Sequence, residues 1–225
     1  MAFTLNSVVP WGRNYEEYCK MFLLNEEDKK KKIAGFGDGP ASFNVEAHRK
    51  GCDVTSYDPI YQFNRNALEQ RIDEVREIVI QQMKENADHY VWTEIHNLPE
   101  LEEIRMSAMR FFLEDYDIGK SEGRYVYHEL PNRLQVEDDF YDIGLSSHFL
   151  LMYTALGYEF HIQAMTEMLR VCKEIRVFPI VDLDAKQSDL ITEVIEYFRG
   201  KYDVEIKETG YEFQKGANKL LVIAT

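Results

Sequence analysis

The sequence predicts an α/β fold, with a mostly parallel sheet of about seven strands and helices between them. An apolar strand, a helix and a second strand fit within 32–57, which suits a parallel strand–helix–strand unit. Apolar runs and amphipathic stretches alternate again over 122–225. The last two runs, 204–209 and 220–224, are joined by a link too short for a crossover helix, so this pair should be antiparallel.

The N-terminal part, 1–29, is expected to form a helical arm. Asn14 and Glu17 have the spacing of a capping box, and the helix that they open should end near Leu24. A strand is then expected over 32–36.

The first crossover helix is expected to begin at Pro40, because proline suits the first helical position, where its missing N–H costs nothing. Gly51 should end this helix after Lys50. The second strand is expected over 53–57.

Only helical signals follow between 64 and 117, where Leu68, Ile72 and Val75 mark one helical face. We therefore expect a helical insert over 62–121. An insert at a ligand-bearing sheet edge often encloses a substrate, so it is interpreted as a possible cap. The elements expected after it are strands at 124–128, 141–146, 174–180, 204–209 and 220–224, with helices at 159–171 and 191–198.

Composition narrows the class of protein. A length of 225 residues fits a single domain, 1–225, and a formal charge of -14 argues against duplex nucleic acid or an anionic membrane as a partner. Cys19, Cys52 and Cys172 are unpatterned, which predicts neither disulfides nor a zinc site. Without an apolar leader or a run of about 18 apolar residues, a cytoplasmic protein is expected.

The residues that point to a ligand follow the first two strands. Gly35, Gly37 and Gly39 occupy alternate positions, where glycine permits positive φ or close approach to a ligand. Asp58 follows the next strand and could accept hydrogen bonds from ribose hydroxyls. Because ligands of open α/β sheets bind outside the carboxyl ends of strands, these residues predict a nucleoside-binding crevice.

A dinucleotide site is the first alternative. Pro40 stands where the G-x-G-x-x-G fingerprint requires its last glycine, which favours a nucleoside without a diphosphate. An NAD-dependent oxidoreductase remains an alternative, as does a non-catalytic module that keeps the cofactor pocket.

The chain resembles the class I S-adenosylmethionine-dependent methyltransferases. The resemblance covers about 30–60 and 122–225 and is carried by the terminal hairpin and by 35–39, Asp58–Pro59 and 140–149. A closer likeness, to uncharacterised bacterial methyltransferase-like proteins, is carried by 9–13, 39–43, 147–150 and 178–179. The resemblance implies a Rossmann-like sheet of order 3-2-1-4-5-7-6 with its last strand antiparallel, helices on both faces, and S-adenosylmethionine as the cofactor.

The resemblance also implies roles for individual residues. The glycines would pass under the methionine part of the cofactor, and Asp58 would hold the ribose. Leu130 and Pro131 would border the adenine, and Ser146 and Ser147 would lie beneath the sulfonium. The cofactor-binding residues expected are Trp11, Arg13, Gly35, Phe36, Gly37, Gly39, Asp58, Pro59, Leu130, Pro131, Ser146 and Ser147.

Two further expectations concern the N-terminal arm and the base. Trp11 and Arg13 could fold over the crevice, with Arg13 pairing with the cofactor's carboxylate.

His148 is the candidate catalytic base, because it follows the fourth strand and can titrate near neutral pH; the alternative is that it orients the loop. The expected reaction transfers methyl to O, N or C of a small molecule, with no metal and an oligomeric state that the sequence leaves open.

Overall fold

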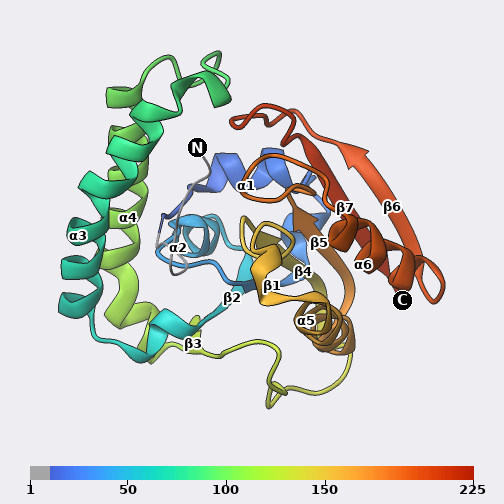
Figure 1. Ribbon diagram of the computed structural model, residues 1–225. Helices are drawn as coiled ribbons and strands as arrows, with labels where there is room; N and C mark the ends of the chain where they lie inside the picture. The colour runs from blue at the N-terminus through green and yellow to red at the C-terminus, as the bar shows by residue number, and fades with distance from the viewer. Residues whose placement is uncertain (1–10) are drawn as a thin grey trace.

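The computed structural model describes residues 11–225 and joins seven strands into one sheet of order β3-β2-β1-β4-β5-β7-β6 (Figure 1). Neighbours among β1 to β5 are parallel, whereas β7 is antiparallel to both β5 and β6. The predicted strand order and the antiparallel last strand are therefore confirmed. The strands are β1 (Lys32–Phe36), β2 (Asp53–Asp58), β3 (Tyr125–Tyr127), β4 (Tyr141–Ser147), β5 (Cys172–Phe178), β6 (Asp203–Glu208) and β7 (Lys219–Ala224).

Helices cover both faces of the sheet. On one face, α1 (Tyr15–Met21) and α2 (Phe43–Arg49) bury a core that includes Ile33. On the other, α5 (Tyr158–Val171) and α6 (Asp189–Arg199) bury a second core with Ala34. Because consecutive strand residues point to opposite faces, neighbours in β1 serve the two separate cores. The capping box predicted at the start of α1 is present.

The start of α2 differs from the prediction. The helix begins at Phe43, not at Pro40. Gly37 and Gly39 have φ values of 71° and 57°, which keep this stretch in a loop. The N–H of Ser42 donates to the carbonyl of Arg13 at 3.0 Å, so the N-terminal arm binds the loop just before the helix starts.

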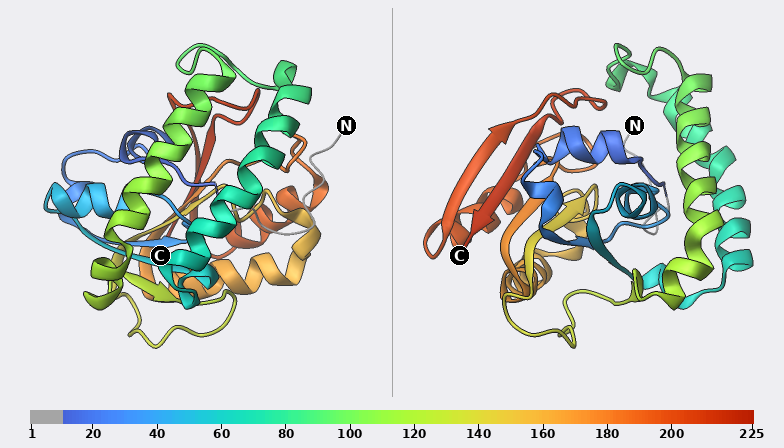
Figure 2. Two further views of the ribbon diagram at one scale, coloured as in Figure 1. Left: turned by 90° about the vertical axis from the view of Figure 1, so that its left-hand side faces the viewer. Right: turned by 180° about the vertical axis from the view of Figure 1, so that it is seen from behind.

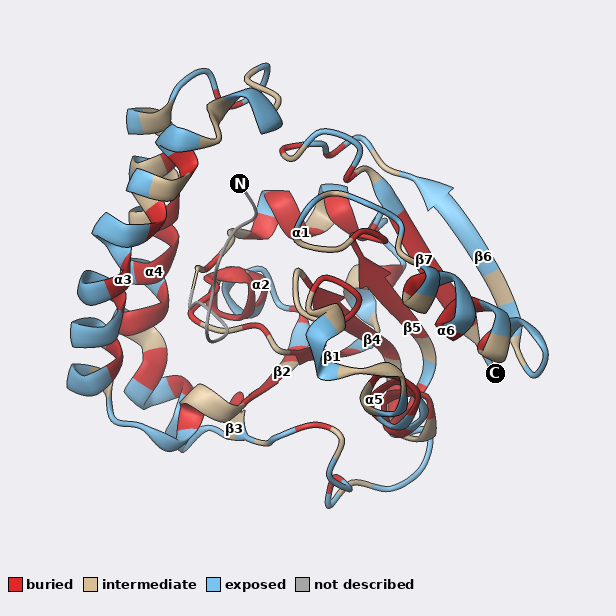
Figure 3. Cartoon of the chain, viewed as in Figure 1, coloured by how far each residue is buried: buried red, intermediate tan, exposed pale blue. Residues whose placement is uncertain are grey.

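The helical insert after β2 is a pair of long helices, α3 (Arg65–Glu85) and α4 (Leu98–Ser121), which run side by side along the β3 edge of the sheet (Figure 2). A third apolar cluster joins the two helices to the body of the protein. The outward faces of these helices are exposed, as is β6 at the opposite edge (Figure 3). None of the helices in 11–225 is both long and apolar enough to cross a membrane.

Part of the expected N-terminal arm, 1–10, lies outside the described residues. Val9 and Pro10, which contributed to the resemblance, are among those ten positions. Short 3-10 turns complete the chain at Asp28–Lys30, Pro59–Gln62, Ala87–His89 and Thr154–Leu156.

Candidate functional site

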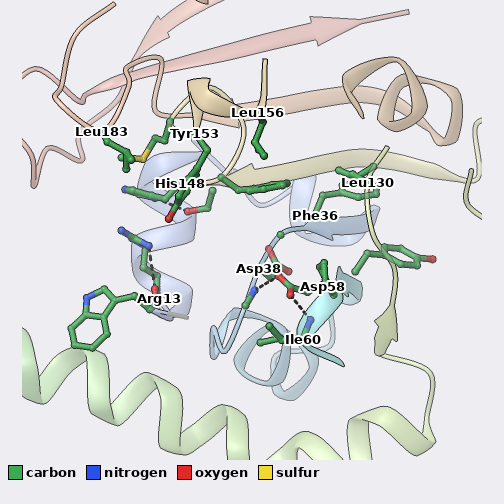
Figure 4. A pocket seen from close by; sticks show the side chains of 18 of the residues that line it. Arg13, Phe36, Asp38, Asp58, Ile60, Leu130, His148, Tyr153, Leu156 and Leu183 are labelled. Carbon is green, nitrogen blue, oxygen red and sulfur yellow. Dashed lines mark hydrogen bonds between the residues drawn. The ribbon is translucent and has the colours of Figure 1, made fainter. Parts of the chain in front are cut away.

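A cavity of about 430 Å³ opens where the carboxyl ends of β1, β2 and β4 meet (Figure 4). This volume falls within the range of about 300–1,000 Å³ that is usual for small-molecule sites. The cavity lies where the sequence predicts the crevice. The predicted residues that line it are Trp11, Arg13, Phe36, Gly37, Gly39, Asp58, Pro59, Leu130, Ser147 and His148.

Three predicted residues do not line the cavity. Gly35 lies inside β1, and Ser146 is fully buried in β4, where its hydroxyl has no hydrogen-bond partner among the described residues. Side chains alternate along a strand, so Ser147 reaches the cavity and Ser146 does not. Pro131 follows Leu130 through a cis peptide bond and lies just beyond the lining.

Asp58 closes the glycine turn. Its carboxylate accepts hydrogen bonds from the N–H groups of Gly39 and Ile60, both at 2.8 Å. The carboxylate is buried, and burial raises its pKa to about 6, although these two N–H donors favour the charged form. Each oxygen keeps a free lone pair, so Asp58 can still accept from a hydroxyl of a ligand.

Asp38 is a site residue that the sequence did not single out. The hydroxyls of Ser56 and Tyr18 donate to its two oxygens at 2.6 and 2.9 Å. Burial, with the nearby Asp58, raises the pKa of Asp38 to about 6. A Cβ added at Gly35 would lie 1.8 Å from Asp38 Oδ2. Gly35 therefore leaves the space that the Asp38 carboxylate fills.

The sequence feature that could have identified Asp38 as a site residue is its position between Gly37 and Gly39. An acidic residue between two glycines with positive φ has little freedom to reach solvent once its loop is buried. What the sequence could not give is the partner hydroxyl of Tyr18, which comes from α1, 20 residues upstream.

Two guanidinium groups line the cavity from other directions. Arg105 on α4 is buried, and its Nη1 donates to Glu17 Oε2 at 2.6 Å, while the Tyr211 hydroxyl donates to Glu17 Oε1 at 2.9 Å. Arg13 lies near this group, and its guanidinium donates to the carbonyl of Trp11 at 3.3 Å. One carboxylate thus faces two positive charges.

His148 lies at the end of β4, with a φ of 53°. Its backbone N–H donates to the carbonyl of Phe178 at 2.7 Å, and its Nδ1 is 2.8 Å from Ser147 Oγ. Burial, together with the charges of Arg13 and Arg105, holds the pKa of His148 well below its usual value. The expectation that His148 titrates near neutral pH is therefore wrong, and the ring is neutral at pH 7.

The remaining wall was not predicted in detail. Part of it comes from Val79 and Met83 on α3 and from two loops that bind each other, 89–92 and 213–215, which we call the clasp; another part comes from Met152, Leu156, Phe160 and Leu183. In the clasp Tyr90 pairs with Gln214 as an antiparallel bridge, and the N–H of Val91 donates to the carbonyl of Phe213 at 2.7 Å. Loops more than 100 residues apart carry no local pattern that would announce such a contact.

No group of three or more His, Cys, Asp or Glu side chains in 11–225 is arranged to hold a metal ion. Two acidic residues, Asp182 and Asp184, follow β5 but are not part of such a group. The Asp182 carboxylate accepts hydrogen bonds from the N–H groups of Asp184 and Lys186, both at 2.9 Å, as in a turn.

No family profile matches the chain. The uncharacterized protein MJ0045 of Methanocaldococcus jannaschii is 34% identical over 221 residues, which are 97% of each chain. This relative is archaeal, so the expected bacterial grouping is not supported.

Solved structures show the fold. The mitomycin 7-O-methyltransferase MmcR matches with a TM-score of 0.50 and 10% identity, over 93% of this chain and 53% of that one. A TehB-like S-adenosylmethionine-dependent methyltransferase from Corynebacterium glutamicum matches with a TM-score of 0.49 and 15% identity, over 94% of this chain and 88% of that one. The chain belongs to the family of MJ0045, and its sheet, with strand order 3-2-1-4-5-7-6, has the fold of the class I S-adenosylmethionine-dependent methyltransferases.

Proposed function

We propose that the protein is an S-adenosylmethionine-dependent methyltransferase that moves a methyl group to an O, N or C atom of a small molecule. The observation that carries the proposal is the pairing of the glycine turn with Asp58 across the carboxyl ends of β1 and β2. Both features face one cavity, in a sheet whose strand order is that of the class I methyltransferases.

Different residues of the cavity would contact different parts of the cofactor. Gly39 gives the methionine part an unobstructed backbone, since no atom lies within 4 Å of the position that a Cβ would take there, and Asp58 accepts hydrogen bonds from the ribose. Leu130 and Ile60 supply apolar surface for the adenine, and Phe36 and Pro59 border the same half. The cofactor brings an activated methyl group, so the protein's task is to align the acceptor and exclude water.

Ser147 and His148 lie at the point where the methyl group would be transferred. The neutral His148 ring can accept a proton from an acceptor that still carries one. Its contact with Ser147 fixes the ring orientation, which suits either a base or a positioning residue.

Binding tests this proposal. Calorimetric titration with S-adenosylhomocysteine should give a single site, and Asp58→Ala should weaken it by about 1–3 kcal/mol, or about 5- to 150-fold, because a charged acceptor is lost. Asp53→Ala is the matched control: it removes a carboxylate from the exposed start of the same strand and should change nothing. Unchanged affinity in Asp58→Ala would refute the placement of the ribose.

A second titration separates the rivals. Tight binding of NADH without binding of S-adenosylhomocysteine would replace the methyltransferase with an oxidoreductase. If S-adenosylhomocysteine binds but a broad metabolite screen yields no methylated product, a non-catalytic pocket is favoured.

A further inference from the structure

The two ends of the cavity carry opposite charge. The carboxylates of Asp38 and Asp58 lie at one end, and the guanidinium groups of Arg13 and Arg105 line the other. Figure 4 shows Arg13 and His148 on one side of the cavity and Asp58, Ile60 and Leu130 on the opposite side. The ligand that fills the whole cavity must therefore differ in charge from end to end.

The positive end is not neutralised by the protein. Glu17 forms an ion pair with Arg105 at 2.6 Å, and no ion pair joins Arg13 to any acid within 11–225. Residues 1–10 contain no Asp or Glu, so no side-chain carboxylate from that segment can pair with Arg13. Two guanidiniums and one carboxylate leave one positive charge unmatched in a largely desolvated place, which is costly without a counter-ion.

Hydrogen bonding indicates the same kind of ligand. The indole N–H of Trp11 and the Nε–H groups of Arg13 and Arg105 are buried without a partner among the described residues. All three are donors only. A buried donor without a partner costs about 1–3 kcal/mol, so three of them near one another favour a ligand that brings acceptor oxygens.

The positive end lies beside the point of methyl transfer. Arg13 and Arg105 both lower the pKa of His148, whereas the pKa of Asp38 responds to Ser56, Tyr18 and Asp58 and to neither arginine. Under the proposed function, a sulfonium would lie beside His148, adding a further positive charge. Like charges so close in a low dielectric repel, and an anion between them relieves the repulsion.

We propose that the methyl acceptor is a small aromatic or apolar molecule that carries an oxygen anion, a carboxylate or an ionised acidic hydroxyl, and that Arg13 binds this anion. The inference rests on the proposed function. Tyr90 and Phe213 of the clasp and Met83 supply the apolar surface for the body of the acceptor.

The reaction then needs no proton transfer. A lone pair of the acceptor oxygen forms a bond to the methyl carbon while the carbon–sulfur bond breaks, and its electron pair stays on sulfur as a neutral thioether. The acceptor loses one negative charge and the sulfonium one positive charge. In this case His148 is a positioning residue and not a base, which agrees with its contact with Ser147.

The cofactor's own carboxylate is the other source of an oxygen anion, and binding distinguishes the two. S-Adenosylhomocysteine carries that carboxylate, and 5′-methylthioadenosine lacks it. If the acceptor's anion binds Arg13, Arg13→Gln should change the affinity for either compound less than 3-fold. A loss of 10-fold or more for S-adenosylhomocysteine alone would assign Arg13 to the cofactor and overturn the inference.

The acceptor is tested at saturating S-adenosylhomocysteine. The probes are pairs of aromatic acids and their neutral amides, such as 2-hydroxybenzoate with 2-hydroxybenzamide and phenylacetate with phenylacetamide, titrated calorimetrically. At least one acid should bind 10-fold or more tightly than its amide, and Arg13→Gln should reduce that preference below 3-fold. Arg110→Gln, which removes the same charge from the exposed face of α4, should behave as the natural protein does.

The possible outcomes are distinct. If no acid binds better than its amide, or if the preference survives in Arg13→Gln, the inference is wrong while the cofactor site stands. If the natural protein does not bind S-adenosylhomocysteine at all, the proposed function itself is wrong.

Discussion

The cavity joins two halves that are built in different ways. The half around Asp58 and the glycine turn is formed by loops directly after neighbouring strands, and its hydrogen bonds link residues about 20 positions apart or fewer. The half around Arg13 and the clasp is formed by α1, the insert and the β6–β7 loop, which contact one another across 88 to 194 residues. The first half follows from a local motif, whereas the second depends on the whole fold.

The two halves also handle charge differently. The carboxylates of the first half are satisfied by backbone N–H and hydroxyl donors. The second half depends on a buried ion pair. Substitutions should therefore damage the two halves in different ways, and the expected effects are given from the largest to the smallest.

The largest effect is expected at the buried ion pair between Arg105 and Glu17 in the second half. Arg105→Met should lower the free energy of unfolding by about 3–5 kcal/mol, because it leaves the buried Glu17 carboxylate without its partner. Urea denaturation measures this loss. The double variant Glu17→Gln/Arg105→Met should recover much of it, because the variant removes one charge of each sign and leaves only Arg13 charged, as in the natural protein. A loss below 1 kcal/mol in Arg105→Met would contradict the ion pair as the central support of this half.

The next effect concerns pH in the first half. Burial raises the pKa of Asp58 to about 6 in the folded protein, above its unfolded value, so Asp58 favours folding below about pH 4 and loses that contribution as pH rises through 6. Asp58→Asn cannot titrate. Its stability relative to the natural protein should therefore rise by about 3 kcal/mol between pH 3 and pH 8.

Urea titrations at several pH values measure that difference. Asp53→Asn, at the exposed start of β2, is the control and should track the natural protein throughout. A difference for Asp58→Asn that is flat with pH would show that the carboxylate is not desolvated as the geometry requires.

These contrasts explain how much the sequence could predict. The antiparallel β7, the capping box at Asn14 and the placement of Asp58 follow from local patterns, whereas the strand order came from the resemblance. The predicted start of α2 at Pro40 was wrong. The preference of proline for the first helical position is a local signal, whereas the hydrogen bond from Ser42 to Arg13 joins this loop to the N-terminal arm.

The sequence predicts only some of the residues in the second half. Trp11 and Arg13 were expected over the crevice because of their position before the first helix. Arg105 and Tyr90 lie in an amphipathic insert whose pattern shows which helical face is buried, not which groups it meets. The low pKa of His148 likewise depends on arginines from two distant segments.

A glycine substitution examines the first half at finer scale. Gly35→Ala should destabilise the protein by about 2 kcal/mol, because the new Cβ would meet the Asp38 carboxylate and displace it from its two hydroxyl donors. Gly200→Ala is the control, since its φ is -71° and the nearest atom to its Cβ would be 3.7 Å away. If Gly35→Ala is as stable as that control, Asp38 does not depend on the space above Gly35.

The smallest effect is expected in the clasp. Phe213 stacks on Tyr90 with ring centroids 4.9 Å apart and meets Trp92 edge-on at 5.5 Å. Phe213→Leu keeps the residue apolar but removes both ring contacts, so it should cost about 1 kcal/mol. The clasp is made of loops outside the seven strands, so we expect it to open without unfolding the sheet. The loss should then appear as hydrogen exchange about 5-fold faster at the Val91 amide, with the amides of β1 and β4 unchanged. Phe140→Leu, a matched change at an exposed ring before β4, should leave Val91 exchange as it is. Equal acceleration at Val91 and in β1 would mean that the clasp opens only with the whole domain, and the second half would then be as rigid as the first.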